Sequence, residues 1–307
     1  MKKLTLLSVA ILTLLSTGCN GHKHSYELVA TDGWHTCIEG QDFDTTGLKV
    51  TLKCTDCDEE KEVEYELEDN TNLQADQTSI KIKYQDYTID YPITVKKKYK
   101  IACVGDSLTA GHNWANESYP TYLGKTVDSK YEVGNYGVNG ISITGYGGSW
   151  KNPNQRYIKQ DVYKNVCKFA PDIFAIMLGT NDATEWSKAE PTFLSEYKIL
   201  LDSFKEQFPN ARTIMMVSPP TVYPNQFGIP NEEIKNYVNP IQRQLAEEYG
   251  FEVLDLRNEF EATEDYQTKY LRPNNDNVHF TKAAAQYVAN RVWDIAKWSE
   301  LSFICCF

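Results

Sequence analysis

The chain has 307 residues, of which 41% are hydrophobic and 24% are charged, and its formal net charge is −11. This composition excludes an intrinsically disordered or fibrous protein, and the length fits one medium-sized domain together with a smaller one. The acidic balance argues against a protein that binds nucleic acid, because the phosphate backbone requires a basic face. The chain also has eight cysteines, whose roles depend on the cellular compartment.

Residues 1–18 have the pattern of an export signal. Lys2 and Lys3 precede the apolar run Leu4–Leu15, and small residues follow up to Cys19. The run is too short to span a bilayer, which takes about 20 apolar residues. The segment resembles a bacterial lipoprotein signal, which implies cleavage before Cys19 and a lipid on that residue; a simple secretory signal is the alternative. Both interpretations predict export, either as a lipoprotein held at the membrane only by its lipid or as a secreted protein.

Residues 19–97 carry most of the negative charge, with 8 basic and 17 acidic residues, whereas residues 98–307 carry 21 and 25. Apolar and polar residues alternate in four short segments of the first region: Leu48–Lys53, Val63–Leu67, Ile80–Tyr84 and Tyr87–Tyr91. A period of two indicates strands with one buried face. Short strands separated by Asp, Asn and Gly predict a small antiparallel β-sandwich without helices.

This region resembles the bacterial immunoglobulin-like modules of surface proteins. The matching features are Phe43–Val50, a Glu-rich strand after it, and the closing Tyr91–Val95. The resemblance implies an Ig-like β-sandwich over residues 19–97 that acts as a spacer or an adhesive unit. No catalytic cluster is evident in it.

His35, Cys37, Cys54 and Cys57 are candidate zinc ligands, since Cys-x-x-Cys spacing suits that metal. The competing interpretation is a disulfide of Cys37 with Cys54 or Cys57. We favour the disulfide, because only one Cys-x-x-Cys pair is present and an exported protein meets an oxidising compartment.

Beyond Lys98 the hydrophobic period changes. Four near-continuous apolar strands are expected at Ile101–Val104, Asp172–Leu178, Thr213–Val217 and Phe251–Leu256. Segments with helical period lie between or after them, at Phe193–Phe208, Asn231–Tyr249 and Thr281–Trp298. Buried strands alternating with helices predict an α/β domain over residues 98–307, with a flavodoxin-like, doubly wound parallel sheet. In such sheets the active site lies beyond the carboxyl ends of the strands.

Four short motifs fall at those strand ends. Gly105–Gly111 contains Ser107 directly after the first strand, where its hydroxyl and backbone N–H would open a helix. Asn135–Gly140 is glycine-rich, and a glycine N–H can approach a ligand closely. Leu178–Asp182 contains Asn181, whose side-chain amide is a potential donor. Taken singly, these three motifs are equally consistent with a helix cap and ordinary turns.

The fourth motif is Asp276–His279, before the last helix. A spacing of three lets the carboxylate reach imidazole Nδ1, which fixes the tautomer and leaves Nε2 to accept a proton from a serine. Of the five histidines, only His112 and His279 lie in the α/β region. His112 is five residues after Ser107 and awkwardly placed to meet its hydroxyl, so we expect it to line the pocket.

In order and spacing, the four motifs resemble the blocks of the SGNH (GDSL-type) hydrolase superfamily, over about residues 99–298. The resemblance implies Ser107 as nucleophile, His279 and Asp276 as the other members of a triad, and Ser107, Gly140 and Asn181 as oxyanion donors. It implies two-step acyl transfer. No cofactor and no catalytic metal are expected, and nucleotide-binding glycine patterns are absent from the sequence.

The expected substrate is a small ester or an acetylated glycan. Six aromatic residues fall near the strand-end loops, where they suit sugar rings or fill the core: Trp114, Tyr119, Tyr146, Trp150, Trp186 and Tyr223. A lysophospholipase or thioesterase on the same triad is one alternative, and a non-enzymatic surface adhesin is another. Cys103 is expected in the core and Cys167 near a helix end; the pairing of Cys305 and Cys306 is open.

Overall fold

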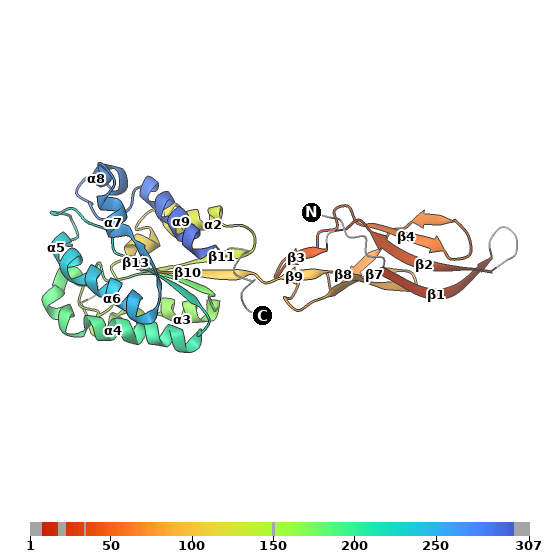
Figure 1. The fold of residues 1–307 in the computed structure, drawn as a ribbon, viewed down its shortest axis with the longest axis horizontal. Helices are drawn as coiled ribbons and strands as arrows, with labels where there is room; N and C mark the ends of the chain where they lie inside the picture. Colours follow the sequence, from red (N-terminus) through yellow and green to blue (C-terminus); the bar gives the residue numbers. More distant parts are fainter. Residues whose placement is uncertain (1–7, 18–22, 34, 149–150, 298–307) are drawn as a thin grey trace. The chain divides into compact units, whose positions relative to one another are not determined.

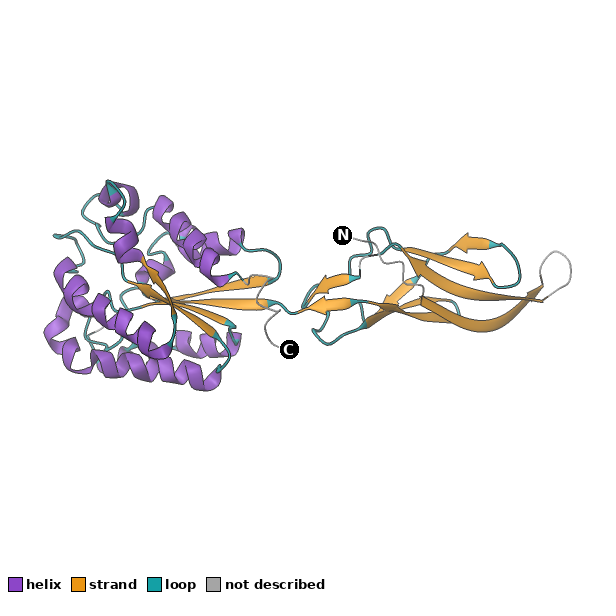
Figure 2. Cartoon of the chain, in the orientation of Figure 1, coloured by secondary structure: helices purple, strands orange, loops and turns teal. Residues whose placement is uncertain are grey.

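The computed structural model describes residues 8–17, 23–33, 35–148 and 151–297. The chain divides into two compact units, Met1–Lys98 and Tyr99–Phe307. The first is built of strands and the second mixes strands with helices (Figures 1 and 2). Each unit is described by itself below.

The described part of the first unit is made of strands and loops. The strands are β1 Ser8–Thr17, β2 Lys23–Thr31, β3 Thr36–Ile38, β4 Lys49–Cys54, β5 Glu60–Glu62, β6 Glu66–Glu68, β7 Ser79–Tyr84, β8 Tyr87–Pro92 and β9 Thr94–Lys96. They form sheets of order β1-β2-β4-β5, β6-β7-β8 and β3-β9. Alternation sets the buried face: Ile80 and Ile82 are fully buried, while the lysines beside them are not. The expectation of purely antiparallel pairing is wrong for β3 and β9, which are parallel.

The apolar segment expected as the core of the export signal forms strand β1. Its backbone pairs antiparallel with β2, from Ser8 opposite Ala30 to Thr17 opposite Lys23. An apolar run that contains β-branched residues suits a strand as well as a signal. The structure describes the uncleaved chain, so the signal remains a prediction, and Cys19 lies outside the described residues.

The expected disulfide of Cys37 with Cys54 or Cys57 is wrong, because all three thiols are free. Cys37 lies on β3, which pairs with β9, whereas Cys54 ends β4 in a different sheet. Cys103 is fully buried in the second unit, as expected, and Cys167 is half-buried. Cys305 and Cys306 lie outside the described residues.

The second unit is organised by a five-stranded parallel sheet. Its strands are β10 Tyr99–Gly105, β11 Tyr131–Gly137, β12 Ile173–Met177, β13 Arg212–Val217 and β14 Glu252–Asp255. Their order in space is β11-β10-β12-β13-β14, with every neighbouring pair parallel. Counted within this unit the order is 2-1-3-4-5, which is the flavodoxin-like arrangement. The predicted α/β class is therefore confirmed.

The helices of this unit include several short turns. They are α1 Ser107–Ala110, η1 Ala115–Glu117, α2 Tyr119–Thr126, η2 Pro153–Gln155, η3 Tyr157–Lys159, α3 Asp161–Phe169, η4 Asp182–Glu185, α4 Trp186–Gln207, α5 Asn231–Glu233, η5 Ile234–Val238, α6 Asn239–Tyr249, α7 Leu256–Glu261, α8 Tyr266–Tyr270 and α9 Lys282–Ala296. The single helix expected over 231–249 is interrupted by the π-helical turn η5. Pro240 explains the break, because it lacks an N–H donor and crowds the carbonyl four residues earlier.

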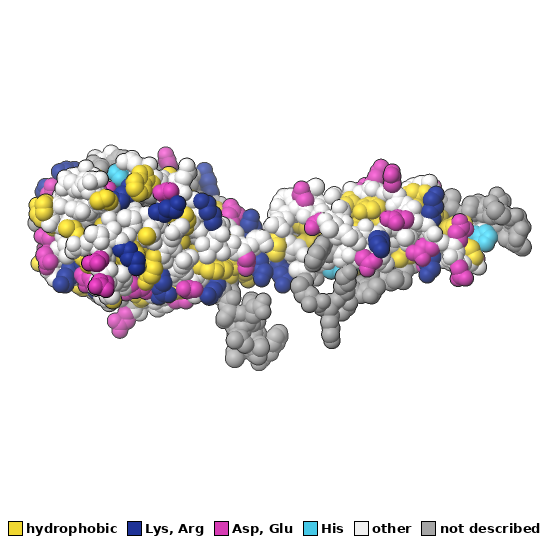
Figure 3. Space-filling view, turned by 90° about the horizontal axis from the view of Figure 1, so that it is seen from above, with side chains coloured by type: hydrophobic (Ala, Val, Ile, Leu, Met, Phe, Trp, Pro, Cys, Tyr) yellow, Lys and Arg dark blue, Asp and Glu magenta, His cyan; other side chains and the backbone are white. Residues whose placement is uncertain are grey.

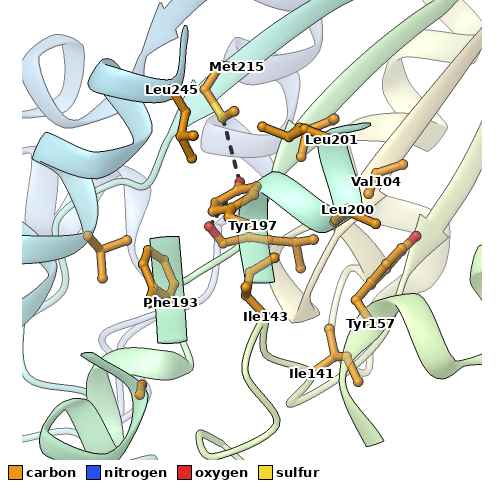
Figure 4. Close-up of a cluster of buried hydrophobic side chains, with 14 of the residues drawn as sticks. Val104, Ile141, Ile143, Tyr157, Phe193, Tyr197, Leu200, Leu201, Met215 and Leu245 are labelled. Carbon is orange, nitrogen blue, oxygen red and sulfur yellow. Dashed lines mark hydrogen bonds between the residues drawn. The ribbon is translucent and has the colours of Figure 1, made fainter. Parts of the chain in front are cut away.

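Both faces of the sheet are covered. Ala102 and Val104 of β10 point into a cluster with residues of α3, α4 and α6, centred on Tyr197 (Figure 4). Ile101 and Cys103 point to the other face and pack with residues of α2, α7 and α9. Successive strand residues face opposite sides, so a continuous apolar run supplies both cores.

Charged side chains of both signs lie on the surface of each unit. On the face of each unit seen in Figure 3, acidic and basic side chains are interspersed. Within the described residues, no helix is both long enough and apolar enough to cross a membrane.

Candidate active site

The candidate nucleophile lies where β10 turns into α1. Asp106 caps the helix by accepting a hydrogen bond from the Leu108 N–H (2.9 Å), and Ser107 is the first helical residue. The turn needs a glycine at position 105, because a Cβ there would lie 2.0 Å from Thr109 Oγ1. Ser107 is 7% exposed at the carboxyl end of the sheet. Its hydroxyl therefore stands where ligands bind in this fold class.

Three side chains from distant parts of the sequence form a hydrogen-bonded row. His279 Nε2 lies 2.8 Å from Ser107 Oγ, and His279 Nδ1 lies 3.0 and 3.1 Å from the two oxygens of Asp276. Asp276 Oδ1 also accepts from the backbone N–H groups of Val278 (3.1 Å) and His279 (2.8 Å). Burial by itself would raise the pKa of Asp276, but the hydrogen bonds from His279 outweigh it and hold the pKa below its ordinary value. The carboxylate is therefore kept charged beside the imidazole.

Arg272 fixes the loop that carries this row. Its backbone N–H donates to His279 O (2.9 Å), and its Nε donates to Phe280 O (2.9 Å). The two terminal nitrogens donate to the carbonyls of His112 (2.7 Å) and Gly111 (3.1 Å) in the loop after α1. One guanidinium thus joins the segment after the serine to the segment of the histidine. No motif in the sequence pointed to Arg272, because its partners are carbonyls about 160 residues away.

His112 lies directly against His279. The two rings are stacked, with centroids 4.0 Å apart and an interplanar angle of 8°, and the Phe227 ring is perpendicular to both, with its centroid 5.4 Å from that of His112 and 4.7 Å from that of His279. Burial lowers the pKa of His112, and the positive charge that His279 can carry lowers it further. A neutral His112 adds no positive charge beside the imidazole. The structure thus places His112 in direct contact with the candidate base His279.

Two of the three expected oxyanion donors, Gly140 and Asn181, lie on neighbouring loops, and the third, the N–H of Ser107, is at the start of α1. Val138 donates to Gly105 O (3.1 Å), which ties the Gly140 loop to the strand that precedes the serine. Gly140 has φ +72, and its N–H makes no hydrogen bond within the described part of the chain. Asn181 Nδ2 donates one hydrogen to Ile141 O (2.8 Å), which orients the amide and leaves its second hydrogen available.

Gly148 lies close to both of these loops, and its lack of a side chain permits the approach. A Cβ at this position would lie 2.4 Å from Gly140 O and 2.8 Å from Asn181 Oδ1, and its φ of +63 also disfavours other residues. The close approach of the three residues means that the geometry of the Gly140 and Asn181 donors depends on the absence of a side chain at 148.

The comparisons with known proteins identify the family of the chain. Residues 103–287 match the GDSL-like Lipase/Acylhydrolase family, and the match covers more than half of the chain. The chain belongs to the GDSL-like lipase/acylhydrolase family. The predicted family resemblance is thereby confirmed, whereas nothing in the comparisons bears on the Ig-like module or the signal.

Two known proteins are similar to parts of this chain. An acetylxylan esterase from Xylanibacter ruminicola is 23% identical over 186 residues, which are 54% of this chain and 37% of that protein. The chain thus matches little more than a third of that relative's length. The structure of a lipase/acylhydrolase from Enterococcus faecalis has a TM-score of 0.50 at 17% identity, with 64% of this chain and 94% of the other covered. The second likeness concerns the fold alone.

Two buried carboxyls, those of Asp182 and Asp106, accept hydrogen bonds from segments next to the candidate site. Asp182 accepts from the backbone N–H groups of Ile143 (2.9 Å) and Thr144 (3.0 Å) and from Thr144 Oγ1 (2.7 Å), which fixes the loop after Gly140. Burial raises the pKa of Asp182 to about 6 and that of Asp106 to about 7. Both groups are fully enclosed, so their role is to hold loops rather than to meet a substrate.

The six aromatic residues expected near the GDSL-like site fall into distinct environments. Tyr119 and Trp186 are buried and fill the core. Tyr146 is half-buried, and Trp150 lies outside the described residues. Trp114 is 46% exposed and stacks on the Arg272 guanidinium at 3.9 Å, while Tyr223 is 65% exposed.

The two exposed rings lie next to the loop that carries Asp276 and His279. Trp114 reaches this loop through Arg272, which bonds the His279 carbonyl. Tyr223 lies between Val222, whose N–H donates to Asn277 O (3.0 Å), and Pro224, whose carbonyl accepts from Asn277 Nδ2 (3.3 Å). Exposed aromatic surface is therefore present next to the segment that carries Asp276 and His279.

Proposed function

We propose that this chain is an exported serine hydrolase of acyl esters, above all of acetyl esters on carbohydrates. The observation that carries the proposal is the 2.8 Å contact of His279 Nε2 with Ser107 Oγ, with Asp276 on the opposite ring nitrogen. A serine hydroxyl is a weak nucleophile until a base removes its proton. A base held in one tautomer by a carboxylate is the arrangement that achieves this.

The reaction is acyl transfer in two steps. Ser107 Oγ attacks the ester carbonyl while His279 Nε2 takes its proton, and the resulting oxyanion accepts from the N–H of Ser107, the N–H of Gly140 and the amide of Asn181. His279 then protonates the leaving alcohol, and the acyl group remains on the serine. Water, deprotonated by the same imidazole, attacks this acyl-enzyme and releases the carboxylic acid. Asp276 stabilises the imidazolium in both steps.

Two observations support a carbohydrate ester. Trp114 and Tyr223 are exposed beside the triad loop, and aromatic faces with polar neighbours suit sugar rings. The relative from Xylanibacter ruminicola is an acetylxylan esterase.

Export is part of the proposal. The charged and apolar start of the chain supports cleavage after residue 18 and a lipid on Cys19. The β-unit that follows has the alternating strands of an Ig-like module, for which we propose a spacer or adhesive role. The enzyme would then act on ester substrates outside the cytoplasm, held at the membrane only by its lipid or released from the cell.

The test is a set of hydrolysis rates for the wild type, Ser107→Ala and Ser187→Ala. Ser187 is exposed on α4 and serves as the matched control. The substrates are p-nitrophenyl esters of increasing acyl length and an acetylated xylo-oligosaccharide. We expect activity on the acetyl substrates in the wild type and the control, and its loss in Ser107→Ala. A preference for long acyl chains would favour a lysophospholipase or thioesterase, and an inactive wild type would favour an adhesin.

A further inference from the structure

A cluster of metal-ligating side chains lies in the β-unit, apart from the proposed catalytic residues. It comprises His24, Cys54 and Cys57, whose potential ligand atoms all lie within 4.8 Å of one another. His24 Nδ1 is 3.3 Å from Cys54 Sγ. The sequence pattern pointed to Cys54 and Cys57 but paired them with other residues.

The strand register explains why His24 joins the cysteines. Strands β2 and β4 pair antiparallel, with Tyr26 opposite Cys54. His24 lies two residues before Tyr26, near the start of β2, and is therefore beside the turn that follows Cys54 at the end of β4. That turn is closed by the hydrogen bond from Cys54 N–H to Glu59 O (2.8 Å), which brings Cys57 back toward the strand end. The three side chains therefore meet because of backbone pairing.

The two remaining residues of the sequence-based set are occupied elsewhere. His35 Nδ1 lies 2.9 Å from the Pro92 carbonyl, and the ring stacks on Tyr91 with centroids 4.9 Å apart. Cys37 lies on β3, in the small sheet with β9. They are not part of the cluster and provide a matched cysteine and histidine for comparison.

We propose that His24, Cys54 and Cys57 bind a zinc ion. Two sulfurs and one imidazole nitrogen form the soft donor set that zinc favours, and a tetrahedral ion has one further position for water or another donor. The N–H of Asp56 donates to Cys54 Sγ (3.4 Å), a hydrogen bond of the kind that stabilises a ligating thiolate. The ion would join the start of β2 to the β4–β5 turn and stabilise the β-unit.

Zinc binding would also give a role to the exposed thiol of Cys57. Cys57 is exposed, whereas Cys54 is buried, and both are free. In the absence of metal such a pair is open to oxidation, in which the two thiols lose two electrons and two protons to an external oxidant and form a disulfide. Zinc coordination would instead hold both sulfurs as thiolates without a change in oxidation state.

The experiment uses the full chain, purified under reducing conditions and loaded with zinc. Bound metal is measured after desalting, and cobalt substitution reports the ligand type through the thiolate-to-cobalt charge-transfer band. We expect one tightly bound zinc per chain in the wild type, Cys37→Ser and His35→Ala. Loss of an outer-shell partner lowers metal affinity by about 10- to 100-fold. We expect a larger loss of zinc affinity when a ligand itself is removed, in His24→Ala, Cys54→Ser and Cys57→Ser.

Two further readouts keep the test decisive if a variant folds poorly. In the wild type, zinc should protect Cys54 and Cys57, but not Cys37, from alkylation, and it should raise the unfolding temperature of the chain. Ester hydrolysis should be the same with and without zinc, which separates this proposal from the proposed function. Absence of bound zinc, equal binding in ligand and control variants, or a Cys54–Cys57 disulfide that persists in reduced, zinc-supplied protein would overturn it.

Discussion

Replacement of Asp276 by asparagine should abolish catalysis while leaving the fold intact. Oδ1 of this residue accepts both backbone hydrogen bonds, from the N–H groups of Val278 and His279. An asparagine must keep its oxygen there, because its NH₂ group would otherwise face two donors. The NH₂ group then takes the place of Oδ2, 3.1 Å from His279 Nδ1, while the retained oxygen stays 3.0 Å from the same nitrogen. A proton on Nδ1 would then face the hydrogens of the NH₂ group, so we expect the ring proton to move to Nε2.

An Nε2 that carries a proton cannot accept one from Ser107. We therefore expect kcat to fall by about 10⁴, equivalent to about 5 kcal/mol of lost transition-state stabilisation. Because both backbone bonds survive, the urea midpoint should change little. Asp276→Ala is the contrasting variant: it removes the acceptor of two backbone N–H groups, at roughly 1–3 kcal/mol for each buried donor left without a partner.

The assay is kcat for p-nitrophenyl acetate together with urea unfolding of both variants. The reasoning predicts that Asp276→Asn is inactive and stable, and that Asp276→Ala is inactive and destabilised. An asparagine variant that keeps more than about a tenth of the wild-type kcat would refute the tautomer argument.

Three further predictions concern the loops around the serine. Asn181→Ala should lower kcat by about 10²–10³ with little change in KM, measured by steady-state kinetics, because one oxyanion donor is lost. Gly148→Ala should also lower kcat, since its Cβ would displace Gly140 O and Asn181 Oδ1; unchanged kinetics would contradict the close approach. Asp106→Asn should gain stability relative to the wild type as the pH rises from about 4 to 7, measured by urea unfolding across that range. The sign follows because the folded pKa of about 7 exceeds the ordinary value of 3.8. Between these values the unfolded wild-type chain releases a proton that the folded chain retains, so the wild type loses stability as the pH rises, whereas asparagine does not titrate.

The sequence predicted the parallel sheet and pointed to Ser107, His279 and Asp276, which the structure brings into contact. Near-continuous apolar runs indicated buried parallel strands, and strand ends in such sheets meet at one edge, so motifs far apart in the chain were expected to converge. The three-residue spacing of Asp276 and His279 also constrained their contact locally. Periodicity and chain geometry suffice for the sheet and for the convergence of its strand ends, whereas the roles of the site residues were implied by the family resemblance.

The remaining features depend on long-range packing that has no local pattern. Arg272 is recognised by carbonyls of another loop, and backbone carbonyls have no sequence signature. His24 joins Cys54 and Cys57 only through the register of β2 on β4, which alternation alone does not fix. The disulfide prediction failed for the same reason, because Cys37 belongs to a different sheet from Cys54. Of the six aromatic residues, Tyr119 and Trp186 proved to be core, since composition does not distinguish a packed ring from an exposed one.

The central claim is that His279 activates the hydroxyl of Ser107. The most direct measurement is mass spectrometry of the chain after reaction with a fluorophosphonate, which labels an activated serine covalently. The account predicts one adduct per chain on the peptide that contains Ser107, formed rapidly in the wild type and far more slowly in His279→Ala. An adduct on another residue, or equal labelling of Ser107 in the two proteins, would contradict it.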